Sequence, residues 1–593
     1  MATIKTSKKT TPTTINVFYG LNESTDGDTE LKLGEASVMK NWRVTDGGKL
    51  KKMEGYAPLF TSLGTGKIQG QWYGKVTGTF YHLFAYGGSI YKRTSGTNTI
   101  IGTMTDAPTS FFFFNEKVYM KNGHEYKSWD GTTFADVAGY RPKIAISTPP
   151  GGGGTLYEET NRLTGAKHQT FSPSGTLTAY QLAETAITSV DFVYDGTTLK
   201  TAGTDYTVNL TTGIVTFTTA PTAGTPNSID IGWTKGTGDR ASILGCLFAR
   251  VYGGANDSRV FIFGNDTTRN RLYYTGLADT VPSAEYFPAN GYIEVGSDEF
   301  SVTDAQKHQS SLLIFTEKGS YYASYESVTL SSGLVAASFP AYSINDIKGN
   351  VALGQVKIIN NNPLSIYEGI YEWTLITVGS DARNANYISR RVQPSLDLVD
   401  LTKAVTFDWE EKGEYWLCVG SLCWIYNYRI GVWYQRENVK AYNFLEIDGE
   451  LYFGTDGTIM KFDPDLRTDN GIAIKAVWEM NFYDFGFEYL NKYMNNVWAS
   501  IKPDPKVRLD IATVTNNDGT GETQTIYYSL ATFEHADFNK WSFLTSYNPQ
   551  PFYIEIQAMG FTYFKLILTN ESLNEDCTVL SINMPARMGG KVR

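Results

Sequence analysis

Histidine and cysteine are scarce in this chain of 593 residues. No histidine has a second histidine or a cysteine at the spacing of metal ligands, so the sequence predicts no zinc site. The five histidines are His82, His124, His168, His308 and His535. The four cysteines, Cys246, Cys418, Cys423 and Cys577, are too few for a disulfide scaffold in so long a chain, and we expect reduced thiols.

One pair of cysteines is close in sequence. Cys418 and Cys423 flank Gly420 and Ser421, and a strand-turn-strand context would bring them near each other across a hairpin. Because no second pair of ligands accompanies them, we interpret them as core cysteines rather than as a metal or redox site.

Long apolar runs are also missing. No segment reaches the roughly 18 apolar residues that a membrane helix needs. The first residues, Met1 to Thr14, are rich in threonine and lysine and contain no apolar stretch, which is not the pattern of a secretory signal. The sequence therefore predicts a soluble protein that is made in a host cytoplasm and does not insert into a membrane.

Charged residues make up only 19% of the chain, and the net charge is −10. Nucleic-acid binding over a broad face depends on lysine and arginine that neutralise phosphates, so this balance argues against such binding. An acidic surface is compatible with DNA as a passing cargo, because a conduit works better when its wall does not hold what moves through it.

Motifs of catalysis and nucleotide binding are absent. The glycine run at 151–154 lacks the Lys-Ser/Thr of a phosphate loop, and no Gly-x-Ser-x-Gly nucleophile motif occurs. The segments 128–134 and 455–459 partly resemble the Asp-containing turns of sialidases but lack their residue order, and Asp-Gly is typical of any tight hairpin. We predict no enzyme and no catalytic, cofactor-binding or metal-binding residue.

Aromatic residues and glycine are abundant. They include 39 Tyr, 32 Phe and 57 Gly, a mixture of strand formers and turn formers that predicts an all-β protein with little helix. A chain of this length exceeds one hydrophobic core, so several domains are expected.

Similar hairpins recur along the chain, each with an apolar strand, a glycine-containing turn and a strand rich in tyrosine or phenylalanine. They occupy residues 81–91, 114–123, 311–322, 364–371 and 451–460. Several of their intervals fit the roughly 40–50 residues of a four-stranded propeller blade. A β-propeller is favoured because stacked blades cover both faces of each hairpin; a set of separate β-sandwiches is the alternative.

Stretches rich in glycine and proline, together with changes in composition, divide the chain into five parts. We predict a flexible or partner-bound arm over 1–16, the first part of the propeller over 17–148, an inserted β-sandwich over 149–240, the second part of the propeller over 241–469 and a C-terminal antiparallel β domain over 470–593. Pro149–Gly154 is interpreted as a flexible linker. Strands are expected inside the insertion near 190–194, 205–209, 213–217 and 228–232. Residues 586–593 are expected to form a basic tail.

Several stretches together resemble the β-propeller tail proteins of bacteriophages, the group that includes the tail nozzle or tail tubular proteins of short-tailed phages. The hairpin at 34–43 and 48–56 is similar to one near the start of that family. The most specific part is the run Ser258–Asn265, Asn270–Leu277, Tyr286–Pro288 and Tyr292–Gly296. Two further segments add to the resemblance, Trp424–Tyr434 and Gly589–Arg593. The threonine-rich insertion departs from the family pattern.

The resemblance implies a structural protein of the virion. Such chains assemble into rings, here expected to be homohexamers, that attach below the portal and adaptor proteins. The ring would form the conduit and gate for genome ejection, with DNA as transiting cargo that is not recognised by sequence. The alternatives are a tail adhesin that binds host glycans and, further from the pattern, a glycan-cleaving propeller.

Overall fold

The computed structural model describes residues 10–24, 31–254, 257–329, 335–375, 383–504, 506–516, 519–521, 523–529 and 548–591. The chain divides into a central unit (69–356 and 377–382) and a terminal unit (1–68, 357–376 and 383–593). Helices in the described residues are short: α1 (Arg240–Leu244), α2 (Gln393–Leu396) and two 3-10 turns (Arg390–Val392, Leu401–Lys403). The protein is nearly all-β, as its composition predicts.

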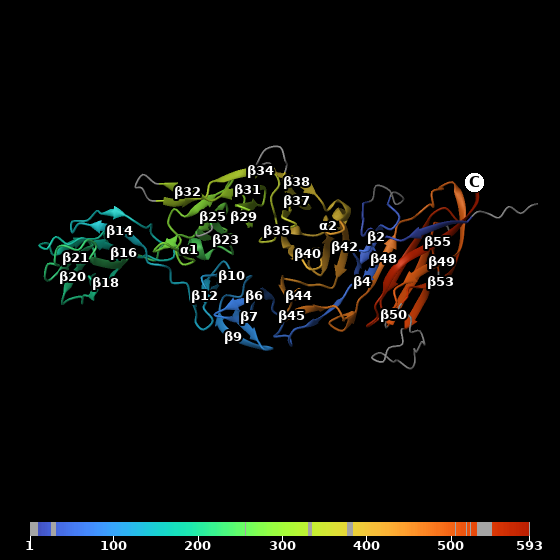
Figure 1. Ribbon diagram of the computed structural model, residues 1–593, viewed down its shortest axis with the longest axis horizontal. Coiled ribbons are helices and arrows are strands. Elements are labelled where there is room, and N and C mark those ends of the chain that lie inside the picture. The colour runs from blue at the N-terminus through green and yellow to red at the C-terminus, as the bar shows by residue number, and fades with distance from the viewer. Residues whose placement is uncertain are drawn as a thin grey trace, which may run out of the picture. The chain divides into compact units, whose positions relative to one another are not determined.

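Four antiparallel sheets of four strands follow one another in the central unit (Figure 1). Their strands are β6 (Ile68–Val76), β7 (Thr79–Tyr86), β8 (Ser89–Thr94) and β9 (Thr97–Thr103); β10 (Ser110–Phe114), β11 (Lys117–Lys121), β12 (Tyr126–Trp129) and β13 (Phe134–Asp136); β23 (Phe248–Gly254), β24 (Asp257–Phe263), β25 (Arg271–Tyr274) and β28 (Tyr292–Glu294); β29 (Val302–His308), β30 (Ser311–Thr316), β31 (Gly319–Ser324) and β34 (Ala341–Asn345). β10 contacts β23, and β23 contacts β29, so first strands of successive sheets are neighbours.

Two small hairpins extend these sheets. They are β26 (Leu277–Ala278) with β27 (Val281–Pro282), and β32 (Glu326–Thr329) with β33 (Val335–Ser338). 

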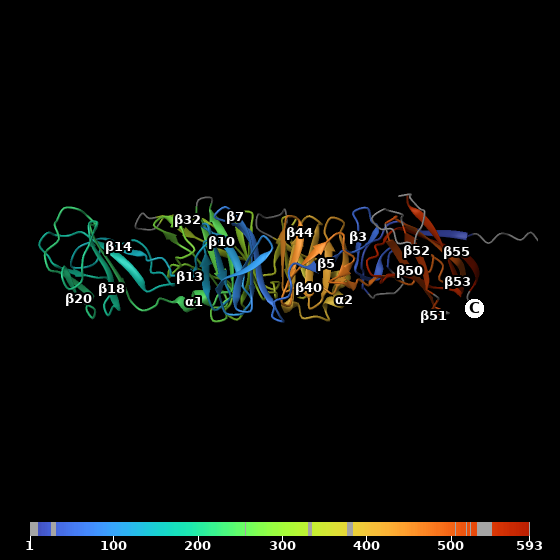
Figure 2. The same cartoon turned by 90° about the horizontal axis from the view of Figure 1, so that it is seen from below.

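Between β13 and α1 the chain forms two further sheets, coloured cyan to green in Figure 2. One contains β14 (Lys143–Thr148), β15 (Thr155–Leu156), β16 (Ala166–Phe171), β18 (Ser189–Asp195), β19 (Thr198–Leu199) and β22 (Ile229–Thr234); the other contains β17 (Ala179–Gln181), β20 (Tyr206–Asn209) and β21 (Ile214–Phe217). Both contribute to one core that includes Phe171, Tyr180, Phe217 and Trp233. All four strands expected inside the insertion are present.

The glycine run differs from its interpretation as a linker. Ala145 pairs with Leu156, so 149–154 form the loop between two strands of one sheet. Gly152, Gly153 and Gly154 have φ near +90°, a conformation that glycine adopts without strain. The inserted sheets consequently begin at β14, before the boundary expected at 149.

The terminal unit contains three further four-stranded meanders. They consist of β35 (Lys357–Ile359), β36 (Asn362–Ile366), β37 (Ile370–Leu375) and β38 (Arg383–Tyr387); β39 (Val405–Trp409), β40 (Glu414–Val419), β41 (Leu422–Asn427) and β42 (Val432–Glu437); and β43 (Asn443–Ile447), β44 (Glu450–Gly454), β45 (Ile459–Asp463) and β5 (Gly55–Pro58). The last meander receives its fourth strand from the N-terminal part of the chain. β35 contacts β39, and β39 contacts β43.

The rest of the terminal unit is built from two larger sheets, drawn mainly in red and blue in Figure 1. One joins β3 (Trp42–Val44), β4 (Leu50–Lys52), β55 (Thr578–Lys591), β49 (Leu490–Ile501) and β53 (Gln550–Phe561), with β1 (Thr10–Ile15) also on β55; the other extends the meander of β39–β42 through β2 (Ala36–Lys40), β48 (Ala476–Met480), β54 (Phe564–Asn570) and β50 (Lys506–Thr515) to β51 (Gly519–Thr520) and β52 (Gln524–Ser529). β46 (Thr468–Asp469) and β47 (Ile472–Ala473) continue the sheet of β5. β50 and β52 contact β53, and β3 contacts β48, so the two sheets lie against each other.

The N-terminal strands tie the terminal unit together. β1 pairs with β55, β2 lies between β42 and β48, β4 pairs with β55, and β5 pairs with β45. The arm expected over 1–16 is therefore a strand in its described part, and the tail expected from Ala586 is strand as far as Lys591. The two segments form hydrogen bonds with each other. The sequence of either segment alone does not indicate this pairing.

Four of the five predicted hairpins are confirmed, and they correspond to the pairs β7–β8, β30–β31, β36–β37 and β44–β45. The segment 114–123 contains only the last residue of β10 together with β11, because the hairpin formed there begins at Ser110. Asp46, Gly47 and Gly48 form the turn that joins β3 to β4, and Gly48 has a φ of 70°.

Candidate functional site

The histidines occupy separate places. His82 is buried against Gln71, at 3.0 Å between Nε2 and Oε1, and burial lowers the pKa of His82 to about 4. His168 contacts the Asp230 carboxylate through Nδ1 at 2.8 Å. His308 is buried and His124 is exposed, while His535 lies outside the described residues. Within the described ranges, no three His, Cys, Asp or Glu side chains are grouped to hold a metal ion.

The expectation of reduced thiols is wrong for one pair of cysteines. Cys418 on β40 lies directly opposite Cys423 on β41, with 4.0 Å between their Cα atoms, and a disulfide joins them. Directly opposed positions on antiparallel strands bring Cβ atoms close enough for this bond. Cys246 and Cys577 are free and buried.

The two Asp-containing turns are held by local contacts. Asp130 accepts hydrogen bonds from the backbone N–H groups of Thr132 and Thr133, at 2.9 and 2.7 Å, in the turn between β12 and β13. Asp456 accepts hydrogen bonds from Lys440 and the Tyr442 hydroxyl. Asp130 thus shapes its own turn, whereas Asp456 joins the turn between β44 and β45 to the segment before β43.

A group of charged side chains is buried where the N-terminal strands meet the sheet of β39–β42, and we call it the polar seam. Its members are Arg43, Glu54, Glu414, Arg436 and Asp469. Arg43 Nη1 donates to both oxygens of Glu54, at 3.0 and 2.7 Å, and Nη2 donates to Glu414 at 3.3 Å.

The two carboxylates that share Arg43 have opposite pKa shifts. Burial on its own raises the pKa of Glu54, but the charge of Arg43 and hydrogen bonds outweigh burial and lower the pKa to about 2. At Glu414 burial dominates and raises the pKa, although Tyr434 and Trp416 both donate hydrogen bonds to this carboxyl group. The seam therefore holds one firmly ionised pair and one carboxyl group that resists ionisation.

Arg436 forms the second half of the seam. Its side chain is fully buried and pairs with Asp469 through both terminal nitrogens. It also donates to Asn41 Oδ1 at 3.0 Å and to the Glu54 carbonyl at 3.2 Å. One guanidinium thus joins strand β42 to residues beside β3, β5 and β46.

A carboxyl group on β39 provides a pH-dependent element. Burial, with a contribution from Glu410, raises the pKa of Asp408 from 3.8 to about 6, although Tyr428 donates a hydrogen bond at 3.1 Å and Lys357 opposes the shift. Because the folded-state pKa lies above the unfolded one, the native state binds more protons between the two values. Stability from this group is present at low pH and is lost as pH rises toward 6.

We expect Asp408→Asn to remove this dependence. After allowance for solvent screening of a half-buried group, the variant should be about 1 kcal/mol more stable than the parent at pH 7.5, and equal to it near pH 4. Urea unfolding of both proteins across this range measures the difference. The exposed Asp465→Asn is the control and should show no such trend; a constant offset between parent and Asp408→Asn at all pH values would contradict the assignment.

In the central unit, polar side chains form hydrogen bonds to the two segments that connect the inserted sheets to the rest of the unit. Asn161 donates to the carbonyls of Tyr140 and Glu285 and accepts from the N–H groups of Leu163 and Phe287. Arg240 donates to the carbonyls of Leu163 and Val137 at 3.0 and 2.8 Å. 

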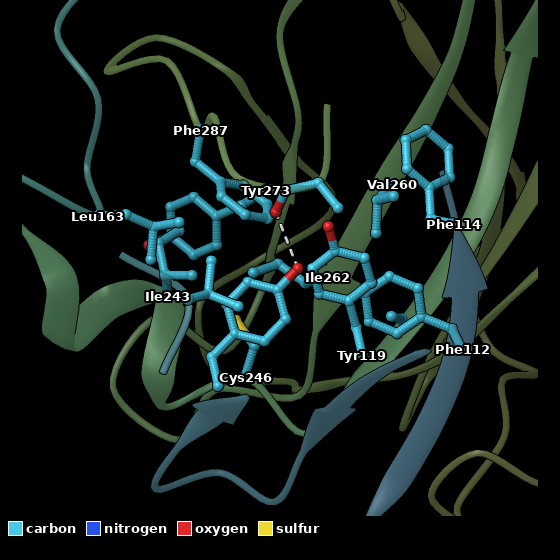
Figure 3. Packing of buried hydrophobic residues seen from close by; sticks show 14 residues of the cluster. Phe112, Phe114, Tyr119, Leu163, Ile243, Cys246, Val260, Ile262, Tyr273 and Phe287 are labelled. Atoms are coloured by element: carbon cyan, nitrogen blue, oxygen red, sulfur yellow. Dashed lines mark hydrogen bonds between the residues drawn. The ribbon is translucent and has the colours of Figure 1, made fainter. Parts of the chain in front are cut away.

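Apolar residues of the same connectors enter a core between two sheets (Figure 3). Leu163 and Ile243 pack there with Phe112 and Tyr119 from one sheet and Ile262 from the next. These contacts hold both segments that connect the inserted sheets to the rest of the central unit. The inserted sheets are therefore anchored where they join the unit and are not attached through a flexible linker.

The outer face of the sheet β55–β49–β53 carries exposed apolar side chains. Trp498 is 41% exposed, Tyr553 is 54% exposed and Met559 is 51% exposed. Trp498 and Tyr553 are directly opposite on β49 and β53, and their rings meet edge to face at 5.3 Å. We call Trp498, Tyr553 and Met559 the aromatic face.

The strand that supplies Tyr553 and Met559 is at the sheet edge. Among the described residues, β53 is paired only with β49, while its alternate residues Ile554, Ile556 and Ala558 are buried in the sandwich. A long strand with one edge unpaired among the described residues, and with exposed apolar side chains beside that edge, is a surface on which another chain can dock.

Sequence reasoning did not identify the polar seam, because its members are spread from residue 43 to residue 469 and form no motif. The aromatic face did leave a signal. In residues 550–561, one set of alternate positions contains Phe552, Ile554, Ile556 and Ala558, and the other set contains Tyr553 and Met559. Apolar side chains therefore lie on both faces of this strand, which is more apolar surface than one core requires.

No family model matches the sequence, and no curated protein matches it. Among solved structures, the computationally designed Ika8 protein is 9% identical, with 68% of this chain and 99% of that one covered and a TM-score of 0.30. The AfRom2 CNH domain is 8% identical (69% and 99% covered, TM-score 0.33) and the N-terminal domain of Nup159 10% identical (73% and 100% covered, TM-score 0.18). Likenesses this low carry no argument about function. No helix in the described part of the chain is long and apolar enough to cross a membrane.

Proposed function

We propose that this chain is a non-enzymatic structural subunit of a bacteriophage tail. Copies form a ring, expected to be a hexamer, that belongs to the nozzle or tail tube below the portal and adaptor and serves as conduit and gate for genome ejection. DNA passes as cargo, and the net charge of −10 disfavours its retention on the wall.

The fold proposed for this role is a β-propeller. Its blades would be four-stranded meanders such as those of the central unit. Contacts between the first strands of successive sheets support a radial arrangement, since these are the inner strands of a propeller.

The observation that carries the assembly proposal is the aromatic face beside the edge of β53 that has no paired strand among the described residues. Tyrosine and tryptophan concentrate binding energy at protein interfaces. The occupant is a second copy of this chain, as expected for a ring of identical subunits.

A role as a glycan-binding adhesin is less well supported by this face. Sugars stack on aromatic rings that lie flat and parallel to the sheet surface. The rings of Trp498 and Tyr553 are inclined by 75° to each other, so they do not form one platform.

We expect the double variant Trp498→Ala/Tyr553→Ala to lose ring assembly. Removal of an interface aromatic residue at a hot spot costs about 2 kcal/mol or more, which is roughly a thirtyfold loss of affinity for each residue. Mass photometry of the full chain measures the distribution of oligomers, and circular dichroism checks the fold. Leu398→Ala, at a side chain that is 84% exposed, is the matched control. Unchanged oligomers in the double variant would refute the assignment of this face.

A further inference from the structure

The side chains of Lys52 and Asn570 meet in the interior of the terminal unit. Lys52 Nζ lies 2.7 Å from Asn570 Oδ1, and both residues are completely buried. Lys52 ends β4 and Asn570 ends β54, which belong to the two opposed sheets. Adding the carbonyl bond length of about 1.23 Å, the amine nitrogen is at most about 4 Å from the amide carbon Cγ.

The amide of Asn570 is held with its oxygen toward the amine. Asn570 Nδ2 donates to the Arg508 carbonyl at 2.6 Å, which directs Oδ1 and Cγ toward Lys52. The amine makes two further contacts, with the carbonyl of Ser572 at 3.4 Å and that of Glu575 at 3.2 Å. These contacts hold the nitrogen in place and restrict both partners to one arrangement, the condition under which intramolecular reactions are fast.

The surroundings also favour the reactive form of the lysine. Burial lowers the pKa of Lys52 to about 8. About a tenth of the amine is then neutral at pH 7, and only the neutral amine is a nucleophile.

A carboxyl group is available to move the proton. Glu575 is 6% exposed; Tyr527 donates a hydrogen bond to its Oε1 at 3.1 Å, and its Oε2 is buried with no hydrogen-bond partner in the described structure. A buried oxygen without a partner is costly and calls for a role. The carbonyl oxygen of Glu575 accepts a hydrogen bond from the Lys52 amine at 3.2 Å, so this residue lies beside the pair.

We propose that Lys52 and Asn570 form an intramolecular isopeptide bond, with Glu575 as the proton carrier. The neutral Nζ attacks Cγ of Asn570 and a C–N bond forms; Glu575 takes a proton from Nζ and delivers it to Nδ2. The bond between Cγ and Nδ2 then breaks and ammonia leaves. The products are one amide cross-link and one ammonia molecule, and no oxidant or other reactant is needed.

The bond would join positions 518 residues apart and lock the N-terminal strands to the C-terminal sandwich. Because β4 and β54 lie in different sheets, it would also prevent the two sheets from separating. This inference does not depend on the proposed function, since it concerns one chain only.

The test is the intact mass of the purified full chain, with allowance for removal of Met1. Formation of the bond lowers the mass by about 17 Da, the mass of ammonia. Tandem mass spectrometry of a digest should then find a branched peptide that joins residues 52 and 570. Lys52→Met and Asn570→Ala should restore the mass expected from the sequence.

Glu575→Gln separates chemistry from folding, because it keeps the shape of the side chain and leaves both bonding partners in place. We expect a folded protein by circular dichroism, with the full mass and no branched peptide. Lys492→Met is the matched control: Lys492 is also buried, but its amine contacts only backbone carbonyls, so the loss of mass should persist.

Two outcomes would overturn the proposal. One is a parent protein of full mass after prolonged incubation at pH 8. The other is a mass loss that persists in Lys52→Met or maps to a linear peptide, as ring closure at Asn122-Gly123 would produce.

Discussion

Replacement of Arg436 by methionine is expected to lower the free energy of unfolding of the terminal unit by about 3–5 kcal/mol. Methionine fills much of the same space but leaves the Asp469 carboxylate buried without its partner. Burial already raises the pKa of Asp469 against the opposing charge of Arg436, so loss of Arg436 removes the principal group that keeps this carboxylate ionised. Asn41 Oδ1 and the Glu54 carbonyl lose a donor as well. Chemical denaturation followed by tryptophan fluorescence measures the effect.

The double variant Arg436→Met/Asp469→Leu distinguishes the two sources of this loss. If the penalty comes from the unpaired carboxylate, removing both charges should restore most of the stability, since apolar replacements of a buried pair are often neutral. Lys440→Met, which breaks the exposed pair with Asp456, is the control and should cost about 0–1 kcal/mol. A loss of that size for Arg436→Met would mean that the seam does not hold the strands together.

Replacement of Trp233 by alanine should unfold the inserted sheets while the rest of the central unit stays folded. Trp233 is completely buried in the core shared by both sheets, and its Nε1 donates to Glu184 at 3.1 Å. Loss of a buried tryptophan costs about 3–5 kcal/mol, a large share of the stability of a small domain. Hydrogen exchange followed by mass spectrometry locates the change.

We expect peptides from 166–234 to lose protection and peptides from β23–β31 to keep it, because the connectors are held by Asn161 and Arg240 rather than by the inserted core. Leu199→Ala, at a side chain that is 58% exposed in the same sheets, should leave exchange unchanged. Equal loss of protection throughout the central unit would show that the inserted sheets do not unfold separately.

Local features of the fold were predictable from the sequence. Period-two alternation and turn residues mark a hairpin within a short window, as at Ser311–Tyr322, because both strands and their turn are neighbours in the chain. The strands inside the insertion follow the same rule. Such patterns require no knowledge of distant residues.

Pairing between distant segments was not predictable. The polar sequence of Thr10–Ile15 predicts a flexible arm, yet this segment is a strand that pairs with residues 582–587 at the other end of the chain. The hairpin that brings Cys418 and Cys423 together was predicted, but the disulfide was not, because so few cysteines in a long chain favour reduced thiols. The contact of Lys52 with Asn570 likewise depends on two sheets meeting, and neither residue stands in a motif.

The central claim is that copies of this chain join into a closed ring. Negative-stain electron microscopy and mass photometry of the purified full-length protein test it together. The account predicts a ring of about six copies around a central hole. A protein that remains a monomer at micromolar concentration, with no ring in any view, would contradict it.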